Sequence, residues 1–147
     1  MAQSIKKQHI QNPMWLYENN YIRLCDLFPN IVLGNVNTLQ HDLEHSSLFV
    51  KIKEKNKYTL LLEVIEKYPV DSLWKQALNM RIRIYTDARL AEVVNYQGKT
   101  RFLPKYQVPN PKMYHRDEKH QINHLLYDWL LYLNRYLSRT SEKVIFL

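Results

Sequence analysis

The first regular hydrophobic pattern lies in PMWLYENNYIRLCDLF, residues 13–28. Apolar side chains recur there at intervals of three and four, which is the spacing of one face of an α-helix. Pro13 suits the first turn of a helix and Pro29 is expected to end it. We therefore predict a helix over 13–28 whose core-facing residues are Leu16, either Ile22 or Leu24, Cys25 and Phe28.

The period changes to two further along the chain. Residues 30–46 show no regular pattern and are expected to be irregular. From Leu48, apolar and polar residues alternate in SLFVKIKE, and YTLLLEVIEKY follows after a short polar turn, which predicts two half-buried strands. A three-residue loop would place apolar residues opposite one another in the pairs Ile52–Leu60, Val50–Leu62 and Leu48–Val64.

A second alternating region predicts a three-stranded meander. The segment YPVDSLWKQAL, which contains Pro69, is expected to form a loop with a helical turn before it. In NMRIRIYTDARLAEVV, a two-residue turn at 87–88 would place Arg83 opposite Glu92, on the face shared with Arg81 and Val94. Opposite charges across such a pair stabilise it by up to about 1 kcal/mol. The residues after Gly98 in KTRFLPKY are expected to form a shorter third strand.

The longest helical pattern comes after a connector that contains Pro109 and Pro111. Asp117 and Glu118 suit an acidic first turn, because carboxylates interact favourably with the positive end of a helix dipole. With about 100° per residue, one apolar stripe forms. It consists of Ile122, Leu125, Leu126, Trp129, Leu133 and Leu137.

The same projection separates the charged residues that begin this helix. Glu118 and Lys119 fall at the two margins of the apolar stripe, where they face the sheet. Asp117, His120 and His124 fall on the solvated side, where capping and surface roles suffice for them.

Short turns between strands imply antiparallel pairing. We predict an α+β fold with an antiparallel sheet of about five strands, a hairpin plus a three-stranded meander, flanked by an N-terminal and a long C-terminal helix. Residues 1–12 are expected to be a flexible arm, 13–138 a single domain and 139–147 a short tail.

Composition narrows the function classes. The chain of 147 residues has one cysteine, which excludes an internal disulfide, and its apolar runs are too short to span a membrane. We expect a cytoplasmic protein. The only glycines, Gly34 and Gly98, lie far apart, which excludes dinucleotide-binding and P-loop glycine motifs. The net charge of +7 comes from scattered basic residues and indicates a generic basic surface.

Signals for metal binding and thiol chemistry are weak. His120 and His124 have the i,i+4 spacing of a zinc pair, but Gln121 stands where the zincin pattern has Glu, and no third ligand is evident. Cys25 is interpreted as a small core residue. We expect neither a metal nor a cofactor.

Basic and aromatic residues alternate in and after the second meander strand, as they do on some nucleic-acid-binding sheets. They are Tyr96, Lys99, Arg101, Phe102, Lys105 and Tyr106. The glycine-rich RNA-recognition signature is absent from the sequence, so decoration of an edge strand is the favoured interpretation.

Three segments carry a resemblance to a known family. MRIRIYTDARLAEV, the step Pro109-Asn110 and HRDEKHQINHLLYDWLLYL resemble the YqiB-like proteins of proteobacteria, a small single-domain family of unknown function. The resemblance runs from Met14 through the last helix and implies no activity, cofactor or partner. It marks as family motif the residues Arg81, Arg83, Tyr85, Asp87, Ala91, Glu92, Asn110, Asp117, Glu118, Lys119, Gln121, Asn123 and Trp129.

These motifs suggest one polar cluster, if the start of the last helix crosses the hairpin. Its candidate ligand-binding residues are Arg81, Arg83, Tyr85, Glu92, Glu118, Lys119 and Asn123. The leading interpretation is a non-enzymatic binding or adaptor domain. An ion network that docks the helix is favoured, and an anionic ligand or protein partner held with the helix N-terminus is the alternative.

Two other functions stay open. The first is a small enzyme for a phosphorylated or carboxylated metabolite, with Glu118 or Glu92 as general base and Arg83 as anion clamp. The second is RNA binding through Lys99, Arg101 and Phe102, which is not favoured.

Overall fold

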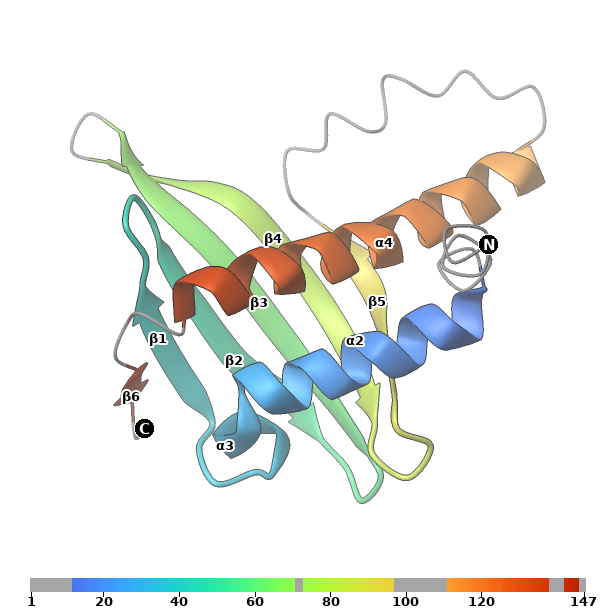
Figure 1. Ribbon diagram of the computed structural model, residues 1–147, viewed down its shortest axis with the longest axis horizontal. Coiled ribbons are helices and arrows are strands. Elements are labelled where there is room, and N and C mark those ends of the chain that lie inside the picture. The colour runs from blue at the N-terminus through green and yellow to red at the C-terminus, as the bar shows by residue number, and fades with distance from the viewer. Residues whose placement is uncertain (1–11, 71–72, 97–110, 138–141, 146–147) are drawn as a thin grey trace.

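The computed structural model describes residues 12–70, 73–96, 111–137 and 142–145. It has two layers, an antiparallel sheet in the order β5-β4-β3-β2-β1-β6 and two long helices that lie side by side on one face of it (Figure 1). The predicted α+β class is confirmed. The elements are α2 (Pro13–Leu27), α3 (Pro29–Val32), β1 (Thr38–Asp42), β2 (Ser47–Lys55), β3 (Thr59–Val70), β4 (Leu73–Tyr85), β5 (Leu90–Tyr96), α4 (Pro111–Leu137) and β6 (Glu142–Ile145).

Helix α2 begins where the sequence predicts. The side-chain oxygen of Asn12 accepts a hydrogen bond from the backbone N–H of Met14 and so caps the helix. Pro13 occupies the first turn. The buried face contains Leu16, Leu24 and Phe28. Ile22 is exposed by 54%, so the helical phase selects Leu24 of the two alternatives, and Cys25 is only partly buried.

Residues 30–46 are more regular than predicted. Pro29 ends α2 but also opens α3, which closes at Gly34 with a positive φ of 82° that favours glycine. The strand β1 follows and pairs with β2. Its inward positions are Leu39 and His41, so a histidine interrupts the apolar alternation that would have revealed the strand.

The β2–β3 hairpin forms with a register different from the predicted one. Ile52 pairs with Leu62, Val50 with Val64 and Leu48 with Glu66, and a bulge lies between Ile52 and Glu54. From Leu48 to Ile52 the pairing is displaced by two positions on β3, which keeps these side chains on their predicted face, whereas beyond the bulge Glu54 pairs with Leu61. An alternating pattern cannot distinguish registers that differ by two residues.

The loop predicted at YPVDSLWKQAL is wrong. Strand β4 begins at Leu73 and pairs with β3 along its whole length, from Val70 opposite Leu73 to Thr59 opposite Tyr85. The pairing of β3 with β2 ends at Lys67, so Pro69 stands where β3 has a neighbour on one side only. Proline is tolerated there as it is on an edge strand.

The β4–β5 hairpin confirms the predicted pair. Arg83 lies opposite Glu92 across a turn that includes Arg89, which has a positive φ of 58°. A register shift beyond Ile82 places Arg81 opposite Asn95 rather than Val94. The predicted third strand lies outside the described residues.

Helix α4 begins at Pro111, earlier than predicted, and no acidic residue occupies its first turn. Asp117 and Glu118 therefore do not cap it. The predicted apolar stripe faces the sheet, and Leu126, Trp129, Leu130 and Leu133 are buried in the core with residues of α2 and β1–β5.

The segment expected as a tail contributes β6, which pairs antiparallel with β1 at the far edge of the sheet. Within the described ranges, no helix is long and apolar enough to cross a membrane.

The phase of α2 can be tested with a matched pair of alanine variants. Leu24→Ala should lower the free energy of unfolding by about 2–5 kcal/mol, because it empties a fully buried site. Ile22→Ala should change it by about 0.5 kcal/mol or less, because Ile22 is mostly exposed. Urea unfolding measures both, and similar losses in the two variants would contradict the observed phase.

Candidate functional site

The predicted polar residues of β4 and β5 lie on the sheet face opposite the helices and at its β5 edge. In the described part of the chain no helix covers that face (Figure 1). Strand alternation directs Leu61, Arg81, Arg83, Tyr85 and Glu92 to it, since their neighbours Leu60, Ile82, Ile84, Ala91 and Val93 are buried on the helix side.

One row of charges crosses the middle of this face. The strand register places Lys51, Glu63 and Arg81 side by side on β2, β3 and β4. Arg81 Nε lies 3.5 Å from Glu63 Oε2, and the Glu63 side chain is only 16% exposed. Arg81 is therefore already paired with a carboxylate.

A second row runs parallel to the first. Arg83 Nη1 lies 4.0 Å from Glu54 Oε2, although Leu61 stands between them in the sheet. The two long side chains meet above Leu61, which is 7% exposed although no described helix covers it. Arg83 is thus turned toward β2 for its ion pair, whereas its cross-strand neighbour is Glu92.

Both carboxylate oxygens of Glu92 are engaged. The Tyr85 hydroxyl donates to Oε1 at 2.8 Å, and Lys119 Nζ lies 3.3 Å from Oε2. The expected contact between helix and hairpin therefore forms through Lys119. The Lys119 side chain is 57% exposed, so it reaches the sheet edge from solvent. The sequence had predicted that it would face the sheet from the inner side of the helix.

Asn123 is buried at the junction of α4, α2 and β5. Its Oδ1 accepts the backbone N–H of Val93 at 2.8 Å, and its Nδ2 donates to the Lys119 carbonyl at 2.9 Å. Its own carbonyl accepts Asn20 Nδ2 at 3.2 Å. These bonds make Asn123 a structural junction that holds one turn of α4 against the sheet and brings Lys119 near Glu92.

The other predicted members do not join this cluster. Glu118 is partly buried, and none of the ion pairs between described residues includes it. The side chain of Asp117 lies outside the described residues. The helix N-terminus at Pro111 lies two turns before Lys119. It is therefore not part of the cluster, contrary to the prediction.

His120 and His124 of α4 are partly buried rather than fully solvated. Their rings lie 5.9 Å apart, and His124 Nδ1 is 3.7 Å from Asp128. Among the described side chains, no group of three or more His, Cys, Asp or Glu is arranged to hold a metal.

Cys25 and Tyr21 line a cavity of about 530 Å³ between α2 and the β4–β5 turn, which also contains Arg89. Burial raises the pKa of the Cys25 thiol, which disfavours the nucleophilic thiolate. Burial also raises the pKa of Tyr21. Because Cys25 lines a cavity and is only partly buried, it is not the core residue that was predicted.

The candidate nucleic-acid face is described at one residue. Tyr96 packs against the core, and burial raises its pKa, so its ring is not presented for base stacking. The remaining members, Lys99, Arg101, Phe102, Lys105 and Tyr106, lie outside the described residues.

Glu54 and Glu63, which pair with the two arginines of the cluster, were not among the predicted site residues. Alternation with the apolar residues of β3 was a usable signal for Glu63, because it directs this residue to the face of Arg81. Alternation along β2 would place Glu54 on the side of Val50, and only the bulge between Ile52 and Glu54 brings it to the face of Arg83. The correct pairing of strands β3 and β4 was also required, and this was predicted as a loop.

The role of Asn123 can be tested by Asn123→Ala. The change leaves the Val93 N–H without its partner in a buried site, so we expect a loss of about 2–3 kcal/mol in the free energy of unfolding. Asn134→Ala, at an exposed position on the same helix, is the control and should change it by about 0.5 kcal/mol or less. Equal effects in urea unfolding would exclude the junction role.

Tyr85 predicts a dependence of stability on alkaline pH. Burial first, and then the hydrogen bond to Glu92, raise the pKa of Tyr85 above its ordinary value of 10.0. A raised folded-state pKa stabilises the fold below pH 10 and loses this effect as pH rises through that pKa. The stability difference between wild type and Tyr85→Phe should be about 1.5 kcal/mol near neutral pH and shrink above pH 10. Tyr58→Phe, at an exposed tyrosine, is the control and should change the free energy of unfolding by about 0.5 kcal/mol or less.

Comparison with known proteins assigns the chain to a family. A family model described as "Protein of unknown function (DUF1249)" matches residues 23–138. The chain is 38% identical over 120 residues to the "Uncharacterized protein YqiB" of Escherichia coli K12, covering 81% of this chain and 84% of that protein. The proteins of the same description from the O6:H1 and O157:H7 strains match to the same extent. No solved structure matches the chain. The chain belongs to the DUF1249 family, which includes YqiB.

Proposed function

We propose that this protein is a non-enzymatic binding domain whose sheet face opposite the helices docks a protein partner. The observation that carries the proposal is that the basic residues Arg81, Arg83 and Lys119 are each paired with a carboxylate of the protein itself. Such pairs hold long side chains in fixed positions, and an ordered pattern of alternating charge can select a partner of complementary charge.

The charge balance favours a protein partner over a small anion. The two rows and Lys119 contain four basic residues (Lys51, Arg81, Arg83 and Lys119) and three acidic ones (Glu54, Glu63 and Glu92), a net charge of +1. An anion would have to displace a carboxylate from an arginine or a lysine to bind there. A protein surface can instead contact both signs at once.

An apolar centre beside the charges supports a docking role. Phe49 and Ile65 are cross-strand partners on the same face, and both are partly exposed. Lys67 Nζ lies 5.5 Å from the centre of the Phe49 ring, which places a further cation at the margin. Protein interfaces commonly combine an apolar centre of this kind with a polar rim.

The enzyme alternative has less support. A general base needs a free oxygen within reach of a substrate proton. The hydroxyl of Tyr85 and the ammonium group of Lys119 occupy the two oxygens of Glu92. The cavity beside α2 is lined by other residues, and neither Glu92 nor Glu118 borders it.

Site-specific photo-crosslinking in cells tests the docking surface. A benzoylphenylalanine at the exposed position of Lys51 should yield one discrete protein adduct, whereas the same group in place of the exposed Ile22 on the helix side should not. Arg83→Glu should abolish the adduct while changing the free energy of unfolding by about 1 kcal/mol or less, since its ion pair is partly exposed. No adduct from position 51, or the same adducts from both positions, would contradict the proposal.

A thermal-shift screen distinguishes docking of a protein partner from binding of a small anion. Inorganic phosphate and citrate should leave the melting temperature unchanged for wild type, Arg83→Ala and Glu118→Gln alike. A rise with either anion that Arg83→Ala abolishes would favour an anion site and contradict protein docking by this face.

A further inference from the structure

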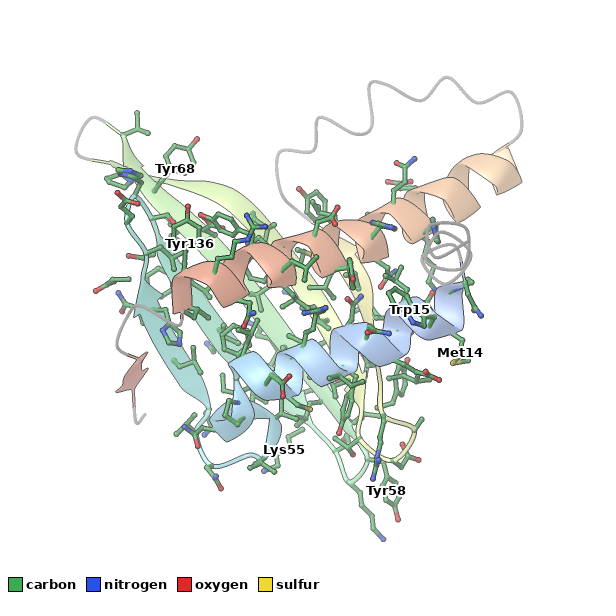
Figure 2. All side chains as sticks on the ribbon, in the orientation of Figure 1. Met14, Trp15, Lys55, Tyr58, Tyr68 and Tyr136 are labelled. Atoms are coloured by element: carbon green, nitrogen blue, oxygen red, sulfur yellow. The ribbon has the colours of Figure 1, made fainter. Side chains whose placement is uncertain are left out.

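A second concave site lies at the opposite end of the helix layer from Asn123. The last turns of α4, the β1–β2 turn and the outer half of β3 enclose a cavity of about 280 Å³. Figure 2 shows Tyr136 on α4 and Tyr68 on β3 at this end of the molecule. The cavity shares no lining residue with the charged sheet face, so it is a separate feature.

Three tyrosines form much of the cavity wall: Tyr68, Tyr132 and Tyr136. The rings of Tyr132 and Tyr136 have centroids 4.7 Å apart and are tilted by 46°. Tyr68 and Tyr132 remain 36% and 39% exposed, so their rings are accessible from solvent. Electron-rich ring faces arranged around a small cavity attract cations.

Two carboxylates complete the wall. Glu66 is held in place because Trp129 Nε1 donates to its Oε1 at 2.9 Å and Ser46 Oγ donates to its Oε2 at 3.0 Å. Glu44 lies on the β1–β2 turn, with a side chain that is 70% exposed. After burial itself, Glu66, then Tyr136 and then Glu44 raise the pKa of Tyr132 through their charges, so both carboxylates act at the same ring.

The sign of this site is opposite to that of the whole protein. The chain carries a net charge of +7, yet the described lining of this cavity includes two glutamates, no lysine or arginine, and one histidine, His45, whose Nε2 lies 3.7 Å from Glu44 Oε1. Carboxylates repel anions, and the aromatic walls supply no ligands for a hard metal ion. The combination suits a cation with an apolar surface, which can contact rings and carboxylates together.

We propose that this cavity binds an alkylammonium group, with Tyr132 and Tyr136 contacting its alkyl surface and Glu44 and Glu66 neutralising its charge. The group can belong to a free amine or to the methylated lysine side chain of a protein, since both present the same head group. This proposal is independent of docking by the sheet face.

Titration with choline, followed by backbone amide NMR, tests the proposal. Choline should shift the resonances of residues around Tyr132 and Glu66, whereas 3,3-dimethylbutan-1-ol, a neutral analogue of the same shape, should bind at least about tenfold more weakly because it lacks the charge. Equal binding of the two compounds, or no binding of choline, would overturn the proposal.

Variants separate the role of the rings from that of the charges. Tyr132→Leu and Glu44→Gln should each weaken choline binding by about fivefold or more, whereas Tyr132→Phe, which keeps the ring, should bind nearly as wild type. Tyr58→Leu and Glu54→Gln, at exposed positions elsewhere, are the matched controls and should have no effect. Tyr132 is 39% exposed and the Glu44 side chain 70% exposed, so the amide spectrum of each variant should show an intact fold. Choline binding that survives both Tyr132→Leu and Glu44→Gln would overturn the proposal.

A peptide containing trimethyllysine identifies the source of the group. Tighter binding of this peptide than of choline would assign the cavity to a protein side chain, and equal binding would assign it to free amines. Either result supports an alkylammonium site, whereas equal affinity for the same peptide with norleucine in place of trimethyllysine would contradict it.

Discussion

The arrangement of this protein depends on one buried amide. Asn123 bonds to its own helix, to α2 and to the outermost strand β5, and each of these bonds would leave a costly unpaired group if it were lost. Because these bonds hold Asn123 in one position, they set the rotation of α4 about its axis. Leu126, Trp129 and Leu133 then enter the core, and Lys119 reaches Glu92. The same rotation directs Tyr132 and Tyr136 into the cavity at the other end.

Local signals predicted the features that depend on one element or one tight turn. The helical period identified α2 and most of α4, and the short turn set Arg83 opposite Glu92. Features that depend on counting residues between strands were less accessible. An alternating pattern is unchanged by a shift of two residues, so it could not place Leu48 opposite Glu66 rather than Val64. Pro69 argued for a loop because its position beyond the end of β2 could not be seen.

The candidate sites likewise include contacts that one element or turn predicts and contacts that depend on strand order. The approach of Lys119 to Glu92 was predicted from helix phase and hairpin register, but the ion pairs of Arg81 and Arg83 with Glu63 and Glu54 required the order of three strands. The tyrosine cavity also has a signal in the sequence, which is the alternation of β3. The alternation of β3 continues past Val64 and carries Glu66 and Tyr68 to the side of the helices. A carboxylate at an inward position needs donors, and Trp129 and Ser46 supply them.

The hydrogen bond from the Val93 amide to Asn123 also affects self-association of the protein through its sheet edge. An outer strand with free amides is a template on which a strand of another chain can add and so extend the sheet. At β5 a helix side chain already occupies one of these amides, and Lys119 places a charge at the same edge. Self-association through growth of the sheet is therefore disfavoured at this edge.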